Sequence, residues 1–265
     1  MCFASDVADR PTIEADYVRL CIHLGPTRRY IVCNMTSDAS ALWISLRLAA
    51  VTTALLLPLC TPLAWWLAMG RARWRLLIDA AVSLPLVLPP TVLGFYLLLI
   101  LAPGGWIGGA LRAVGLASPV FSFTGLVIGS MLYSLPFVVQ PLRDAFESVG
   151  RPLLEAAATL RASAWNRFFS IAVPLAGRGF VTAAVLAFAH TLGEFGVVLM
   201  IGGNIPGSTQ TASIAIFNHA EALEYRAANH LSAMLIAIAF VLLVGLYALT
   251  RPAARGSSVR LWRWN

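Results

Sequence analysis

Few residues of this sequence are candidates for catalysis, because charged and nucleophilic side chains are sparse and scattered. Only 12% of the 265 residues are charged, and 59% are hydrophobic. The four cysteines form no CxxC pair and have no histidine at ligand spacing, which predicts neither a disulfide framework nor a metal site. No Cys/His or His/Asp/Glu cluster is grouped along the chain. The composition therefore favours binding or transport over catalysis.

The polar residues best suited to binding a partner lie in residues 155–174, EAAATLRASAWNRFFSIAVP. Glu155 is expected in the first turn of a helix, where a carboxylate meets the positive end of the helix dipole. Leu160 then leads into a break, and Ser163 is a candidate N-cap for a second short helix. Pro174 is expected to end that second helix. The pattern predicts a helix-turn-helix.

The second helix of this segment has an aromatic face. Trp165, Phe168 and Phe169 stand at positions i, i+3 and i+4, which places them together beside Arg167. Aromatic residues with arginine are typical of protein interfaces. The face therefore predicts contact with a soluble partner. An amphipathic loop that lies on the membrane surface without a partner is the alternative.

Two acidic residues and one arginine interrupt the apolar runs of the chain. An acidic residue within an apolar run, such as Glu194, usually has a function, because a charge is costly inside the membrane. We expect Glu194 to form a gate or a helix–helix hydrogen bond. A residue that merely caps the turn at Gly196 is the alternative. Asp79 and Arg47 stand near the ends of their runs, from which the long Arg47 side chain can reach the interface.

Prolines also interrupt the apolar runs. Pro89 and Pro90, followed by Thr91, remove amide donors and free backbone carbonyls near the middle of one run. Freed backbone groups at that depth are candidates for lining a pathway. A kink that only shapes packing is the alternative.

Five apolar segments have the length of about 20 residues that a membrane-spanning helix needs. The mean hydropathy of +0.79 also lies well outside the range of soluble domains. We therefore predict an all-α integral membrane protein, with a transmembrane domain over 42–250 and a helical loop over 142–178. The five predicted transmembrane helices cover residues 42–69, 77–101, 121–141, 180–201 and 231–249.

Arginines are distributed unevenly among the connections between these segments. The chain has no lysine, and three, five and four arginines follow the first, third and fifth segments. The two opposite connections carry one arginine each, Arg112 and Arg226. Because positive charge stays on the cytoplasmic side, the 142–178 loop and a basic tail at 251–265 are predicted there, with the N-terminus outside. The net charge of +7 thus reflects membrane topology and not a nucleic-acid partner.

Residues 1–41 differ from the rest of the chain. They contain no apolar run of the kind found in a signal peptide. Their arginines would lie on the outer side, against the charge rule. We therefore expect an extension or a disordered N-terminal tail, with Met35 as a candidate true start. The N-terminal sequence of the native protein would decide between these alternatives.

The spacing within residues 155–174 resembles the EAA signature of ABC-importer permeases: EAA, three residues, Gly, nine residues, then Ile-x-Leu-Pro. Val173 stands where that family has Leu, and Arg161 where it has Gly. Glycine there supplies a left-handed residue, which costs a residue with a Cβ about 1–2 kcal/mol. Either Arg161 bears this strain or the turn has another shape. The matching positions are Glu155, Ala156, Ala157, Ile171 and Pro174.

Three further stretches are similar to the molybdate permeases of that family. They are LPLVLPP at 84–90, GEFG at 193–196 and NIPG-x-T at 204–209. The resemblance covers nearly everything after residue 42. It implies a molybdate permease subunit with the ABC-importer permease fold. Because the EAA segment is shared, a tungstate or a sulfate or thiosulfate permease of the same architecture is the first alternative.

The resemblance also implies an assembly. Two copies of this subunit would form one pathway in the lipid of the bacterial inner membrane, and an extracytoplasmic binding protein would deliver the oxyanion. Two cytoplasmic ATPase subunits would bind ATP and Mg²⁺, because this chain has no GxxxxGK[ST] loop. Neither a cofactor nor a catalytic role is therefore expected of the chain itself.

Three groups of site residues follow from the resemblance. The short helix of the EAA segment is implied to insert into a cleft of the ATPase. The pathway or gate residues are Pro89, Pro90, Thr91 and Glu194. The expected contacts with the binding protein, in a turn of Pro, Gly and short polar residues, are Asn204, Pro206 and Gly207. The expected ATPase contacts are Glu155, Ala156, Ala157, Leu160, Arg161, Ala162, Ser163, Trp165 and Phe168.

A secondary anion transporter is the second alternative. Such a protein needs coupling-ion residues in its spans and an internal repeat, and the sequence shows neither. Arg47 is the only arginine within a predicted span, so no strong anion site is expected in the membrane. This pattern favours a low-affinity conduit whose selectivity resides in a separate binding protein.

Overall fold

Helices make up nearly all of the computed structural model, which describes residues 26–70 and 73–250, with side chains from residue 38 onward. A π-helical turn, Arg167–Ala172, joins two of the short helices. The α-helices are α2 (Pro26–Met69), α3 (Trp74–Val87), α4 (Pro90–Leu101), α5 (Trp106–Ala113), α6 (Phe123–Val149), α7 (Arg151–Thr159), α8 (Ala164–Asn166), α9 (Val173–Leu175), α10 (Gly177–Gly193), α11 (Gly196–Gly202), α12 (Ala212–Glu221) and α13 (Tyr225–Thr250).

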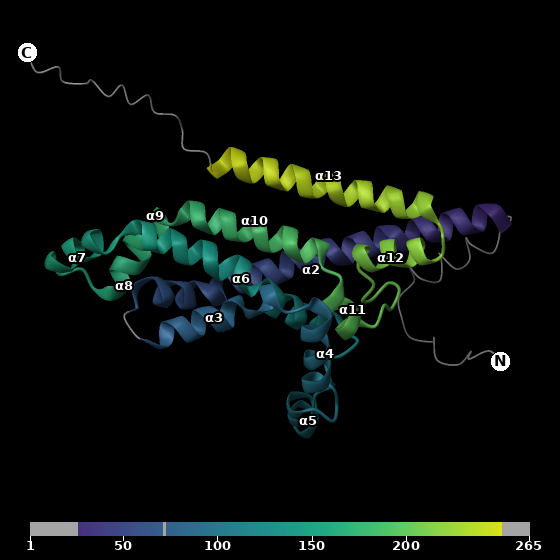
Figure 1. Ribbon diagram of the computed structural model, residues 1–265, viewed down its shortest axis with the longest axis horizontal. Helices are drawn as coiled ribbons and strands as arrows, with labels where there is room; N and C mark the ends of the chain where they lie inside the picture. Colours follow the sequence, from purple (N-terminus) through teal and green to yellow (C-terminus); the bar gives the residue numbers. More distant parts are fainter. Residues whose placement is uncertain (1–25, 71–72, 251–265) are drawn as a thin grey trace, which may run out of the picture.

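The central bundle is formed by α2, α6 and α10, which run side by side (Figure 1). Their shared core contains the fully buried Phe146 and the small residues Ala183 and Ala187. Small side chains let helices approach closely. A Cβ on Gly179 would stand 2.2 Å from the Cβ of Ala145, so this approach of α10 to α6 requires glycine. α3 packs on α6, and α13 lies along α10.

Four helical stretches among the described residues are long and apolar enough to cross a membrane. A fifth is obtained if Ala164–Leu175 and Gly177–Gly193, which bend by 67° at their junction, form one broken span. The all-α membrane fold predicted from the sequence is confirmed, with the predicted segments 42–69, 121–141 and 231–249 inside or largely inside α2, α6 and α13. The four stretches are Asp38–Met69, Pro90–Ala113, Phe123–Val149 and Tyr225–Thr250.

The predicted second span, 77–101, is not one helix. α3 ends at Val87, and Leu88 and Pro89 take extended backbone angles with ψ of 138° and 135°. A residue before proline is pushed out of the helical region, and two consecutive prolines follow Leu88. With 14 residues, α3 is about 21 Å long, short of a hydrocarbon core of about 30 Å. α4 then turns away from the bundle and ends near α5 (Figure 1).

The predicted fourth span, 180–201, is also divided. α10 ends at Gly193, Glu194 and Phe195 leave the helix, and the short α11 follows. α11 packs against α4. Tertiary packing therefore stabilises a break that the continuous apolar sequence did not predict.

The first helix begins earlier than expected. α2 starts at Pro26, so residues 26–41 continue the helix whose later part was predicted as the first span. Further along α2, the buried Ala41 packs with Ala215 of α12 and Leu231 of α13. Residues 1–25 and the tail at 251–265 lie outside the described residues, and a start at Met35 stays a prediction.

Candidate functional site

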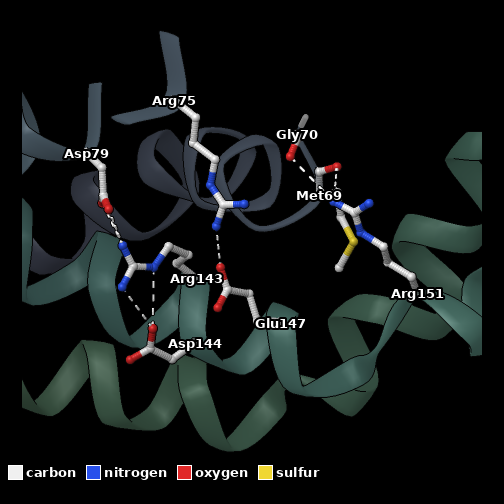
Figure 2. Close-up of polar contacts among 8 residues, drawn as sticks. All are labelled: Met69, Gly70, Arg75, Asp79, Arg143, Asp144, Glu147 and Arg151. Carbon is white, nitrogen blue, oxygen red and sulfur yellow. Dashed lines mark hydrogen bonds and ion pairs between the residues drawn. The ribbon is translucent and has the colours of Figure 1, made fainter. Parts of the chain in front are cut away.

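The 142–178 segment projects from one end of the bundle, and α12 lies at the opposite end (Figure 1). α6 leads directly into α7 through Gly150, whose φ of +79° makes the turn. Arg151 begins α7, and its Nη2 donates to the carbonyl oxygens of Met69 at 3.2 Å and Gly70 at 3.4 Å (Figure 2). A cation on these terminal carbonyls of α2 is favourable. The start of α7 is therefore fixed to the end of α2.

The turn after α7 is a Schellman motif centred on Arg161. Its backbone N–H donates to Ala158 at 3.0 Å, and the N–H of Ala162 donates to Ala157 at 3.1 Å. These two bonds close the helix end, with Arg161 in the left-handed region at φ +63°. Of the two possibilities left open by the sequence, Arg161 bears the strain.

The second helix starts as the sequence predicted but does not end as predicted. The Ser163 hydroxyl accepts the N–H of Asn166 at 3.1 Å, which confirms the N-cap. Pro174 does not terminate the helix: it lies in α9, and the chain bends only at the junction with α10. The π-helical turn before it shifts the backbone pairing, so the missing proline donor does not break the helix.

The predicted single aromatic face is divided between core and surface. Phe168 is half-buried, with its ring centroid 5.2 Å from that of Trp65 and 6.1 Å from that of Phe146. Trp165 is 73% exposed and Phe169 48% exposed, with centroids 4.6 Å apart. Because consecutive residues of the π-helical turn point in different directions, Phe168 can enter the core while Phe169 stays outside. Phe168 therefore fixes the segment to the bundle, and Trp165 and Phe169 remain free for contact.

A hollow of about 380 Å³ lies between the end of α2 and the 142–178 segment. Glu155 lines it together with Arg151 and Arg167. Arg167 Nη1 donates to the carbonyl of Leu154 at 3.4 Å, whereas its buried Nε has no hydrogen-bond partner among the described residues. The hollow is open to solvent and lined by charged residues, which suits the binding of a polar side chain from a partner. Its lining is completed by Trp65, Met69, Leu154 and Ala164.

The remaining predicted contact residues lie around the turn. Leu160 is 84% exposed at the turn. Ala156, Arg161 and Ser163 are exposed. Ala157 and Ala162 are half-buried. The exposed surface of the segment is thus formed by its turn and by the outer side of its second helix.

The structure brings the two predicted gate regions together. A Cβ on Gly196 would stand 2.7 Å from the Cβ of Pro90 and 3.3 Å from the backbone nitrogen of Thr91. Pro90 is half-buried, whereas Pro89 and Thr91 are exposed. The stretches 84–90 and 193–196, separated by about a hundred positions, therefore meet at the two helix breaks.

Glu194 lies at the second of these breaks and is 4% exposed. Neither of its carboxylate oxygens makes a hydrogen bond of ordinary geometry with the described residues, although the Ser130 hydroxyl of α6 interacts with the carboxyl group. Only its backbone N–H participates in the turn, donating to Thr191 at 3.3 Å. The side chain therefore does not cap the turn at Gly196. A buried acid with so little hydrogen bonding is costly to keep.

The turn at 204–209 is fixed by two residues that the sequence reasoning did not select. Asn204 and Asn218 exchange two side-chain amide hydrogen bonds of 3.2 Å. Thr209 donates through its hydroxyl to the carbonyl of Gly202 at 2.6 Å and accepts the N–H of residue 205 at 3.0 Å. The tip, with Pro206 and Gly207, is exposed. Thr209 belongs to the NIPG-x-T stretch, whereas no sequence signal marks Asn218.

Next to this turn, His219 of α12 is held by two carboxylates. Its Nε2 lies 2.9 Å from Oδ1 of Asp38, and its Nδ1 lies 2.8 Å from Oε2 of Glu224. Burial lowers the pKa of His219, but the hydrogen bonds and charges of the two carboxylates outweigh it, so the pKa is raised overall. The imidazole thereby joins α2, α12 and the start of α13.

Comparison with known proteins identifies the family. Residues 60–251 match the family described as binding-protein-dependent transport system inner membrane component. The chain belongs to this family. With its several apolar helices, this inner membrane component is a multi-pass inner-membrane protein.

Curated relatives of this inner membrane component include permeases of two kinds. The molybdenum transport system permease protein ModB of Azotobacter vinelandii is 55% identical over 214 residues, covering 81% of this chain and 95% of the relative. ModB of Escherichia coli K12 is 37% identical over 177 residues, covering 67% and 77%. The probable sulfate transport system permease protein cysT of Chlorokybus atmophyticus is 33% identical over 184 residues, covering 69% and 64%.

Solved structures resemble this inner membrane component in fold. A bacterial ABC transporter that imports alginate has a TM-score of 0.67 at 15% identity, covering 90% of this chain and 89% of that chain. The MetNI methionine ABC transporter, in an inward-facing conformation, has a TM-score of 0.64 at 15% identity, covering 82% and 96%. The predicted ABC-importer permease fold is confirmed.

Proposed function

We propose that this chain is the permease subunit of an ATP-driven importer that carries molybdate into the cytoplasm. Its 55% identity with a molybdenum permease over 81% of the chain carries this assignment. Identity to the sulfate permease is lower, at 33%, which favours molybdate over sulfate. Two copies of the chain would enclose the pathway, and a binding protein would deliver the oxyanion.

The 142–178 segment is the proposed dock for the ATPase. Its surface carries the exposed Leu160, Trp165 and Phe169, and the hollow beside it holds Glu155 and two arginines. Apolar and aromatic residues around a polar recess are typical of interface hot spots. We assign Phe169 to the contact in place of Phe168, whose ring packs inside the bundle. The ATPase would supply the sites for ATP and Mg²⁺, and this chain would take no part in hydrolysis.

The arginine distribution supports an orientation with the 142–178 segment and the C-terminus in the cytoplasm. The opposite end, with α12 and the turn at 204–209, would then face outward. Pro206 and Gly207 at the exposed tip of that turn are the proposed contacts with the binding protein. Asn204 supports the tip through its amide pair with Asn218.

The proposed pathway passes the two helix breaks, where Gly196 contacts Pro90 and Thr91. Glu194, two positions before Gly196, is buried. The guanidinium of Arg47 lies 4.5 Å from the centre of the Phe123 ring, in a cation–π contact that stabilises its position. A pathway without a strong anion site suits a conduit whose substrate selection happens in the binding protein.

Uptake of labelled molybdate tests the substrate. The chain is reconstituted in proteoliposomes with its ATPase and binding protein, and unlabelled tungstate or sulfate is added in competition. ATP-dependent uptake is expected, with sulfate competing poorly. Sulfate competing as well as molybdate would overturn the substrate assignment, and uptake without ATP would favour a secondary transporter.

A double substitution, Leu160→Ala with Trp165→Ala, tests the dock. Loss of hot-spot side chains costs 2 kcal/mol or more, so binding of the ATPase in detergent should weaken by about 30-fold. Trp106→Ala is the matched control, because Trp106 is 92% exposed on α5, away from the segment. Unchanged ATPase binding by the double variant would refute the proposed dock.

A further inference from the structure

Two ion pairs and one hydrogen bond connect α3 to α6. Nη1 of Arg143 lies 2.6 Å from both carboxylate oxygens of Asp79, and Arg75 pairs with Glu147 (Figure 2). One turn further along, Nε2 of Gln140 donates to the hydroxyl of Ser83 at 3.2 Å. These contacts will be called the α3–α6 ladder, with the rungs 75–147, 79–143 and 83–140.

The ladder has a defined register. Arg75 precedes Asp79 by one turn on α3, and Arg143 precedes Glu147 by one turn on α6, so the charges follow the same order along both helices. Antiparallel packing thus brings each charge to an opposite one. A slide of one helix by a turn would place like charges opposite each other. The side chains of Asp79 and Arg143 are 34% and 23% exposed, so water would screen such a mismatch only in part.

The two ends of the ladder lie at functionally different places. Beyond Glu147, α6 ends at Val149 and leads into α7 of the proposed ATPase dock. Beyond Ser83, α3 ends at Val87, immediately before the break at Leu88 and Pro89. The ladder therefore connects the dock to the first of the two breaks that line the proposed pathway.

Apolar packing by itself would not give this connection a fixed register. The apolar core that α3 shares with α6, which includes Val82 and Phe146, is held by the hydrophobic effect, and that effect is non-directional. Paired charges, in contrast, allow few positions of one helix against the other. A displacement of α6 is thus passed to α3 without slippage.

We propose that the α3–α6 ladder couples movement of the docked segment to the helix break that begins α4. Asp79, Arg143, Arg75 and Glu147 are then positioning residues for transport. This inference rests on the proposed function. Loss of a rung lets α6 follow the ATPase while α3 and the break stay behind, so ATP is hydrolysed without import.

The test measures molybdate imported per ATP hydrolysed in proteoliposomes that contain the whole importer. Coupling between sites typically amounts to 5–150-fold, and we expect Asp79→Asn to lower this ratio about tenfold while hydrolysis continues. Glu147→Gln, which removes the other ionic rung, should act in the same direction. Exchange of the charges, Asp79→Arg with Arg143→Asp, should recover most of the ratio because it restores one cross-helix pair.

Asp144→Asn is the matched control. Asp144 also pairs with Arg143, at 3.2 Å, but it lies on the same helix and is 66% exposed, so it connects no other element. Its substitution should leave the ratio within about twofold of wild type, because exposed pairs contribute little.

The outcomes separate coupling from stability. A ratio that stays at the wild-type value in Asp79→Asn and Glu147→Gln overturns the inference, even if import and hydrolysis fall together with thermal stability. A loss in Asp144→Asn as large as in Asp79→Asn overturns it as well. If the wild-type importer moves a different oxyanion, the substrate assignment fails, and the ratio measured with that oxyanion still tests the ladder.

Discussion

Replacing Arg161 with glycine should stabilise the subunit, because the turn after α7 holds Arg161 at φ +63°. The left-handed conformation costs a residue with a Cβ about 1–2 kcal/mol. Glycine avoids this cost but loses about 0.5–1 kcal/mol through its greater freedom in the unfolded chain. The Arg161 side chain is exposed and has no ion pair or hydrogen bond with the described residues. The middle of each range gives a net gain of about 0.75 kcal/mol.

Thermal unfolding in detergent measures this gain. For a chain of 150–250 residues, 1 kcal/mol corresponds to about 2–4 °C, so Arg161→Gly should raise the Tm by about 1–4 °C. Arg161→Ala is the control, since it removes the charge and keeps the Cβ. An unchanged or lower Tm in Arg161→Gly would refute the strain argument. An equal rise in Arg161→Ala would assign the gain to removal of the charge instead.

Three further predictions concern the gate and the outer end. Glu194→Gln should preserve transport and raise the Tm, because a buried amide costs less than a buried carboxylate that makes no hydrogen bond of ordinary geometry; loss of transport in a well-assembled variant would show that the charge is needed. Gly196→Ala should cost about 1–3 kcal/mol of stability through its clash with Pro90, whereas Gly193→Ala, with open space around it, should be neutral in the same Tm assay. His219→Gln should flatten the pH dependence of the Tm. Because the pKa of His219 is raised in the folded chain, its contribution is complete below its ordinary pKa of about 6.5 and is lost as the pH rises through the folded value; identical pH profiles of variant and wild type would contradict this.

The features that the sequence predicted correctly depend on neighbours in the chain. Ser163 caps a helix because its hydroxyl reaches an amide three residues later. At Arg161 the sequence left strain or another turn shape open, and the left-handed φ of +63° decides for strain. The apolar runs predicted α2, α6 and α13, since length and hydropathy are enough to identify a membrane helix.

The features that the sequence did not predict depend on distant residues. Phe168 and Phe169 are chemically alike and adjacent, and only the presence of Trp65 and Phe146 decides which of them enters the core. The division between α10 and α11 at Glu194 arises in an apolar run with no proline. The short α11 that follows this division packs against α4, about a hundred positions earlier in the chain.

The sequence by itself determined that this is a helical membrane protein, that three of its apolar runs form the long helices α2, α6 and α13, and that Ser163 caps the second helix of the 142–178 segment. These properties follow from hydropathy and local hydrogen bonds, which act over a few residues. Only the tertiary structure decided that Asp79 faces Arg143, that Gly196 receives Pro90 and that Phe168 points inward. One orientation of a side chain is favoured over the others only when another helix supplies the opposite charge, the close contact or the apolar surface.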